Sequence, residues 1–170
     1  QTPQATTDFV RRFIAELEVL DNKQESVARG GPSGVRPRAP PPGWVKIHVD
    51  AAVRTGRGGS AAAVCWDQQG NYLGSSSLVI AGVDDPAILE TIACCEALAL
   101  AEDLNVNNLM IASDAKQVVS DIQKSHMGKN AAIIQEIKFR SSSCICNFTF
   151  EGRAANRDAH ELAKFSLSLG

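Results

Sequence analysis

A chain of 170 residues with 44% hydrophobic content can bury one core and is too short for a second full domain. Its net charge of −2 excludes the strongly basic composition that goes with tight, sequence-independent nucleic-acid binding. No stretch approaches the roughly 20 apolar residues of a membrane span, and no signal peptide is visible, so we expect a soluble, intracellular protein without a membrane partner. The sequence leaves nucleus and cytoplasm open.

The first 43 residues divide into two segments. The first segment is residues 1–25. Its apolar side chains recur at helical spacing between positions 7 and 21, which predicts a short amphipathic helix. This helix either docks a protein partner, belongs to an upstream domain or packs on the chain's own globule. Residues 26–43 are rich in glycine and proline, which predicts an extended linker. The chain begins at Gln1 without a methionine, as we expect of a fragment of a larger polypeptide.

From Trp44 the spacing of apolar residues changes from helical to alternating. Val45, Ile47 and Val49 alternate with polar residues, which predicts a strand that ends at Asp50. The predicted elements that follow are strands at 60–66 and 72–80, a helix at 87–104, a strand at 105–114, helices at 116–124 and 131–139, a strand at 144–150 and a helix at 155–167. The order βββαβααβα predicts an α/β domain over residues 44–170, with an antiparallel three-stranded meander inside a mixed five-stranded sheet flanked by helices.

The five cysteines do not fit a secreted disulfide framework, because their number is odd and four of them lie in apolar runs. Cys144 and Cys146 would share one face of a strand, but no histidine stands at zinc-finger spacing. We therefore expect these two thiols to pack in the core.

Three carboxylates occupy positions that suit a metal site. Asp50 ends the first predicted strand, Asp114 ends the fourth, and Glu90 faces the apolar side of the long helix. Burial without a partner is unfavourable by about 2 to 7 kcal/mol even for a neutral polar group. Mg²⁺ prefers oxygen ligands, and two such ions about 4 Å apart would assist phosphodiester hydrolysis. The alternative is that Asp114 caps the next helix, and spacing alone does not decide.

Five segments in the same order resemble the type 1 ribonuclease H family, most closely its plant reverse-transcriptase-like branch. They are Lys46–Ala52, Ala63–Gly70, Glu90 with Glu96–Ala101, Ala112–Val119 and Arg153–Lys164. The resemblance covers residues 44–169 and implies a ribonuclease H-like fold. It also implies that Asp50, Glu90 and Asp114 are three of the family's four metal-binding acids.

The fourth acid is where the chain departs from the family. His160 stands at that position, and Asp158 lies about 200° around the predicted helix, so it cannot take its place. An imidazole suits Mn²⁺ or Zn²⁺ better than Mg²⁺. Ala51 replaces the glycine that usually follows the first acid, and the segment before the closing helix lacks the proton-shuttling histidine of many active members. His126 is not its counterpart.

The resemblance implies endonucleolytic hydrolysis of the RNA strand of RNA–DNA hybrids, with Mg²⁺ as cofactor and Mn²⁺ as an alternative. Asp50, Glu90, Asp114 and His160 are the predicted catalytic and metal-binding residues. The alternative function is a catalytically weak or inactive module that binds nucleic acid or protein. We expect a monomer that binds hybrids weakly. A basic cluster of Lys124, Lys129, Lys138 and Arg140 either contacts the phosphates of the hybrid or is the solvated face of two surface helices.

Overall fold

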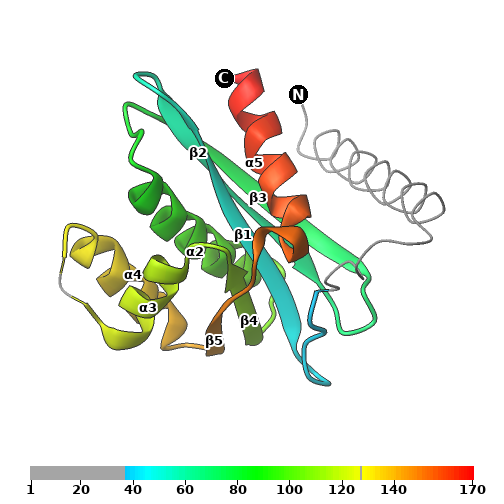
Figure 1. Ribbon diagram of the computed structural model, residues 1–170. Helices are drawn as coiled ribbons and strands as arrows, with labels where there is room; N and C mark the ends of the chain where they lie inside the picture. Colours follow the sequence, from blue (N-terminus) through cyan, green and yellow to red (C-terminus); the bar gives the residue numbers. More distant parts are fainter. Residues whose placement is uncertain (1–36, 127) are drawn as a thin grey trace. The chain divides into compact units, whose positions relative to one another are not determined.

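The computed structural model describes residues 37–126 and 128–170, which belong to one unit (Figure 1). The predicted amphipathic helix, and the predicted linker as far as residue 36, lie outside these residues. Residues 37–44 form neither helix nor strand. The elements are β1 (Val45–Arg54), β2 (Gly58–Trp66), β3 (Tyr72–Ala81), α2 (Pro86–Asp103), β4 (Asn108–Ser113), α3 (Lys116–Lys124), α4 (Ala131–Ser141), β5 (Ile145–Phe150), the 3-10 turn η1 (Arg153–Ala155) and α5 (Arg157–Leu169).

The five strands form one mixed sheet in the order β3-β2-β1-β4-β5. The meander β1-β2-β3 is antiparallel, whereas β4 runs parallel to β1 and β5 runs parallel to β4. The predicted α/β class, the order βββαβααβα and the mixed five-stranded sheet are therefore confirmed.

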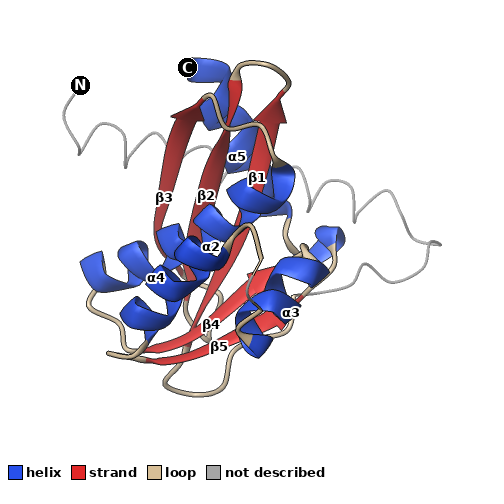
Figure 2. Ribbon diagram, turned by 90° about the vertical axis from the view of Figure 1, so that its left-hand side faces the viewer, coloured by secondary structure: helices blue, strands red, loops and turns tan. Residues whose placement is uncertain are grey.

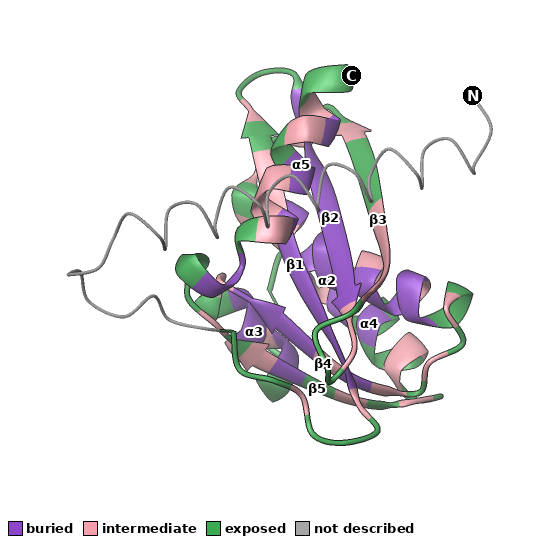
Figure 3. Ribbon diagram, turned by 90° about the vertical axis from the view of Figure 1, so that its right-hand side faces the viewer, coloured by how far each residue is buried: buried purple, intermediate pink, exposed green. Residues whose placement is uncertain are grey.

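Helices cover both faces of this sheet. Figure 2 shows α2, α3 and α4 on one face, and Figure 3, from the opposite side, shows α5 on the other. Helix α2 packs on β1, β2 and β3, while α5 packs mainly on β1 and β2. Among the described residues, no helix combines the length and the hydropathy needed to cross a membrane.

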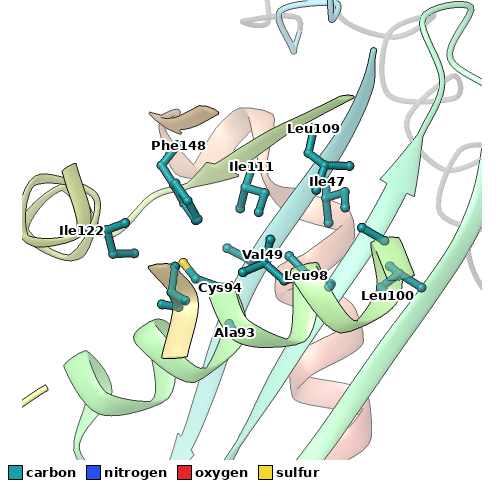
Figure 4. Packing of buried hydrophobic residues seen from close by; sticks show 14 of the residues in the cluster. Ile47, Val49, Ala93, Cys94, Leu98, Leu100, Leu109, Ile111, Ile122 and Phe148 are labelled. Carbon is teal, nitrogen blue, oxygen red and sulfur yellow. The ribbon is translucent and has the colours of Figure 1, made fainter. Parts of the chain in front are cut away.

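The main hydrophobic core lies between α2 and the sheet (Figure 4). Ile47 and Val49 of β1 and Ile111 of β4 meet Cys94 and Leu98 of α2, all at most 2% exposed. Full burial of one such aliphatic side chain contributes about 1.5 to 3 kcal/mol. Of the five free cysteines, only Cys65 and Cys94 are fully buried; Cys95, Cys144 and Cys146 are half-buried at the edge of this core.

Gly59 in β2 lets α2 approach the sheet closely. A Cβ atom on Gly59 would lie 2.2 Å from Cδ1 of Leu89 and 2.7 Å from the carbonyl oxygen of Ala52. Leu89 is itself fully buried, so the space that Gly59 leaves open is filled by this side chain. Because Glu90 follows directly, this packing fixes the turn of α2 that carries it.

Several element boundaries differ from the predictions. The first strand does not end at Asp50, because pairing with β2 continues to Arg54 opposite Gly58. The fourth strand begins at Asn108, three residues later than predicted. Residues before it close α2: Asn105 has a φ of 53°, and Val106 N donates to the carbonyl oxygen of Ala101. The closing helix begins at Arg157, after the separate turn η1.

Candidate active site

Asp50 lies where the sheet opens. The parallel ladder between β1 and β4 ends at the pair Val49–Ser113, so β1 has no β4 partner at the next residue. Asp50 is nevertheless only 2% exposed. Its Oδ1 accepts a hydrogen bond from Ala51 N at 2.9 Å, and its Oδ2 lies 2.6 Å from Nδ1 of His160.

Glu90 and Asp114 approach Asp50 from α2 and from the end of β4. Helix α2 begins at Pro86, with Asp85 as a side-chain N-cap, and places Glu90 half-buried in its second turn. Asp114 directly follows the last residue of β4. It does not cap α3, whose N-cap position is Ala115 and which has no side-chain capping bond. The alternative role for Asp114 is therefore not supported.

Asp50, Glu90 and Asp114 each offer an oxygen, and these three atoms lie within 4.8 Å of one another. Oε2 of Glu90 is buried and has no hydrogen-bond partner in the described part of the chain. Burial, together with the charges of Asp50 and Asp114, raises the pKa of Glu90 to about 9. Burial also raises the pKa of Asp50. An all-oxygen donor set with an unsatisfied buried atom fits a hard divalent cation such as Mg²⁺.

His160 extends from α5 toward the same place, but it is not one of the three residues whose donor atoms lie mutually within 4.8 Å. It contacts Asp50 alone among the predicted site residues. Asp158 does not join them, in line with its position on the helix; its Oδ1 lies 3.0 Å from Nδ1 of His48.

Two residues at the site were missed by sequence reasoning. Nε of Arg153, in η1, lies 3.4 Å from Oδ2 of Asp114, although the Arg153 side chain is 74% exposed. Asn156, 1% exposed, donates from Nδ2 to the carbonyl oxygen of Val49 at 2.6 Å. Both lie in the irregular segment before α5, where no periodicity indicates which side chains turn inward. The available signal for Asn156 was a polar residue next to the predicted start of the closing helix.

The predicted basic cluster is partly occupied by internal partners. Lys129 pairs with Asp85, and Arg140 Nε lies 2.7 Å from Oε1 of Glu136. Lys138 donates to Ser125 Oγ. His126 is exposed, as expected of a surface residue. This cluster therefore offers less free positive charge than its composition indicates.

Comparison with known proteins places this arrangement in a family. The family model described as reverse transcriptase-like matches residues 48–166. None of the curated proteins matches the chain.

Solved structures share the fold at low sequence identity. The RNase H1 of the halophilic archaeon Halobacterium salinarum superposes with a TM-score of 0.69 at 17% identity, covering 75% of this chain and 99% of that one. The N-terminal RNase H domain of a Mycobacterium tuberculosis protein gives 0.67 at 22% identity, covering 74% and 94%. LC11-RNase H1, isolated from compost and solved in complex with an RNA/DNA hybrid, gives 0.63 at 19% identity, covering 74% and 99%. The chain thus belongs to the reverse transcriptase-like family, and its described domain has an RNase H-like fold.

Proposed function

We propose that this protein is a metal-dependent ribonuclease that cleaves the RNA strand of RNA–DNA hybrids endonucleolytically. The observation that carries the proposal is the convergence of Asp50, Glu90 and Asp114 on an RNase H-like fold, with a buried, unpartnered oxygen on Glu90. Three clustered carboxylates repel one another when ionised, so such a cluster favours a bound cation. The complex of LC11-RNase H1 with an RNA/DNA hybrid supports the choice of substrate.

In this proposal the three carboxylates hold Mg²⁺, which when bound would activate a water molecule and stabilise the leaving oxygen. His160 acts as a fourth ligand or as a hydrogen-bond partner that orients Asp50. Since its Nδ1 is directed at Asp50, only Nε2 is left to bind an ion without breaking that contact. An imidazole ligand makes Mn²⁺ a suitable alternative to Mg²⁺.

Hybrid binding is expected to be weak, because residues 44–170 contain 11 Lys and Arg against 14 Asp and Glu, a net charge of −3. Arg153 is the best-placed cation for a phosphate, since it is largely exposed and lies beside Asp114. Recognition would then depend on the backbone shape and the 2′-hydroxyl groups of the hybrid. We also propose that the protein is a monomer and, on the matched segments, that it comes from the plant, retroelement-derived branch.

One observation favours a second candidate, a binding module with weak or no catalysis. The chain supplies its own side-chain partners to two of the three carboxylates, a hydrogen bond from His160 to Asp50 and the Arg153 guanidinium beside Asp114. These contacts lower the repulsion within the cluster even when no ion is bound.

The deciding experiment is cleavage of an end-labelled RNA–DNA hybrid by the purified chain with Mg²⁺ and, separately, with Mn²⁺. Asp50→Asn is the test variant, and Asp121→Asn, which makes the same chemical change in α3 outside the cluster, is the matched control. Duplex RNA and duplex DNA test the choice of substrate. We expect cleavage of the hybrid alone, abolished in Asp50→Asn and retained in Asp121→Asn.

Two other results would change the conclusion. Hybrid binding without cleavage in a folded sample with either ion, unaffected by Asp50→Asn, would favour the binding module. Cleavage that survives Asp50→Asn would show a contaminating nuclease or a different site.

A further inference from the structure

A second polar cluster lies beneath α5, next to the carboxylates but separate from them. Lys46 and His48 of β1 are only 3% and 4% exposed, although both are polar. Lys46 forms an ion pair with Glu151, and His48 contacts Asp158 at the start of α5. We call these four residues, together with Trp66 of β2, the α5 anchor.

Asp158 is the centre of this anchor. Its Oδ1 lies 3.0 Å from Nδ1 of His48, and its Oδ2 accepts a hydrogen bond from Nε1 of Trp66 at 2.5 Å. Both oxygens of one carboxylate are thus held by side chains from two different strands. Helix α5 has no side-chain capping bond at its N-terminus, so contacts of this kind, and not a cap, fix where the helix begins.

The anchor and the candidate metal site are neighbouring contacts between β1 and α5. His48 and Asp50 are two residues apart on β1, so their side chains leave the strand on the same face. Asp158 and His160 are also two residues apart, but on a helix this puts them about 200° around the axis from each other. The two contacts therefore hold α5 from opposite sides: His48 to Asp158, and Asp50 to His160.

Two contacts on opposite sides of a helix determine its rotation about its own axis. If one is removed, the helix can turn about the other, and the ring of His160 then moves relative to Asp50. A metal ligand depends on the residues that orient it, and the loss of such an outer contact commonly weakens metal affinity by about 10- to 100-fold.

A buried ion pair such as Lys46–Glu151 is not by itself a source of stability. Charged groups lose several kcal/mol of hydration on burial, and an apolar replacement of the same volume is often as stable. The neighbouring interface between α2 and the sheet is built mainly from buried apolar side chains. A buried polar cluster next to the carboxylates therefore requires a reason other than stability, and directional positioning of the helix provides one.

We propose that Asp158 is a positioning residue, which through His48 and Trp66 sets the rotation of α5 and so holds His160 against Asp50. The consequence for a bound ion rests on the proposed function, whereas the orientation of His160 does not. The two can therefore be measured independently of each other and of hydrolysis.

The test compares full-length Asp158→Ala with Asp158→Asn and with Glu161→Ala. The asparagine variant can still accept from Trp66 and can donate to the other tautomer of His48. Glu161→Ala removes a carboxylate next to His160 in sequence, and so measures any electrostatic effect on His160 that does not involve the anchor. The first readout is the set of ring ¹H–¹⁵N NMR signals of His160, resolved because the chain has 3 histidines and assigned by their loss in His160→Gln. The second is the Mn²⁺ affinity measured by calorimetry.

We expect Asp158→Ala to shift the His160 ring signals and to weaken Mn²⁺ binding about 10-fold. Asp158→Asn should restore both, and Glu161→Ala should leave both close to wild type. A lower melting temperature in Asp158→Ala with unchanged His160 signals would show a merely structural role and overturn the proposal.

Two further arrangements keep the test decisive. If Asp158→Ala does not fold, Trp66→Phe removes one of its two contacts and should shift the His160 signals in the same direction by a smaller amount; unchanged signals would again overturn the proposal. If the wild-type chain binds no Mn²⁺ and cleaves no hybrid, the proposed function fails, while the His160 signals still decide whether Asp158 positions the ring.

Discussion

The two faces of the sheet are held by different kinds of interaction. On the α2 face, aliphatic and small side chains such as Ile47, Val49 and Leu98 pack without a polar contact among them. On the α5 face, apolar residues such as Leu162 are also buried, but directional polar contacts are added to them: Asn156 to Val49, Asp158 to His48, His160 to Asp50, Ser60 to Ala163 and Arg54 to Leu167. Apolar packing tolerates small displacements, whereas hydrogen bonds weaken steeply as their geometry changes.

This difference indicates a division of labour between the faces. The α2 face contains the main cluster of buried aliphatic side chains, whose burial stabilises the fold. The α5 face aligns one helix with the strand that carries Asp50. The candidate site lies at the gap beyond the β1–β4 ladder, where Glu90 reaches Asp50 from α2 and His160 reaches it from α5.

The largest expected effect is on the α2 face. Leu98→Ala should lower the free energy of unfolding by about 2 to 5 kcal/mol, because the side chain is 2% exposed and its removal leaves a cavity. Urea denaturation followed by circular dichroism measures this change. Leu169→Ala is the matched control, since Leu169 is 73% exposed and should change stability by less than about 0.5 kcal/mol.

The same variant also tests the separation of the two faces. Well below its melting temperature, Leu98→Ala should keep the wild-type affinity for Mn²⁺. A loss of affinity in the folded variant would contradict the division of labour, because it would show that apolar packing about two helical turns from Glu90 also sets the geometry of the site.

The second effect is a pH dependence that originates where the faces meet. The pKa of Glu90 is raised from 4.5 to about 9 in the folded protein, so between these values the folded state holds a proton that the unfolded state has lost. Stability should therefore fall as pH rises through this window, by at most about 1.4 kcal/mol for each pH unit. Melting temperatures from pH 6 to pH 8.5 in the presence of a chelator measure the slope.

Glu90→Gln should flatten this slope, whereas Glu102→Gln, on an exposed part of the same helix, should not. Mn²⁺ should raise the melting temperature more at pH 8.5 than at pH 6, because the ligands bind the ion in their deprotonated form. A wild-type melting temperature that is independent of pH in this window would argue against a raised pKa of Glu90.

The smallest expected effect is on the α5 face. Ser60→Ala removes the hydrogen bond that Ser60 Oγ donates to the carbonyl oxygen of Ala163 at 2.7 Å. The free energy of unfolding should fall by about 1 kcal/mol, the usual net contribution of one hydrogen bond. Ser168→Ala, an exposed serine of α5, is the control. A loss as large as that of Leu98→Ala would mean that polar contacts stabilise this face as strongly as apolar packing stabilises the other.

The sequence predicted the α2 face better than the α5 face, for a physical reason. The spacing of apolar residues reports burial against an apolar partner, so the long helix, the strands and the inward position of Glu90 could be predicted. The alternation of Lys46, His48 and Asp50 with Val45, Ile47 and Val49 indicated a strand with one polar face. It could not indicate that this polar face is covered, because that depends on Glu151 and Asp158 about 100 residues later.

The site residues show the same limit. Two observations predicted Asp50, Glu90 and Asp114 together. Each stands at a predicted strand end or on an apolar helix face, and the resemblance to ribonuclease H implies that all three bind metal. The end of the first strand was predicted wrongly at Asp50, because the alternation of apolar and polar residues stops at Ala51 and Ala52. The turn-forming residues Thr55 and Gly56 follow only after the true end at Arg54. Arg153 could not be predicted, since irregular segments have no repeat from which a side-chain direction can be inferred.

The contacts His48–Asp158 and Asp50–His160 each join residues 110 positions apart. Closing so long a loop is entropically unfavourable, and folding slows as contacts become less local. During synthesis, the meander, α2 and β4 can pair and collapse while α5 is still inside the ribosome. We therefore expect the three carboxylates to come together first. The two contacts that align α5 should form only after the last residues have emerged, so that this site is among the final parts of the molecule to mature.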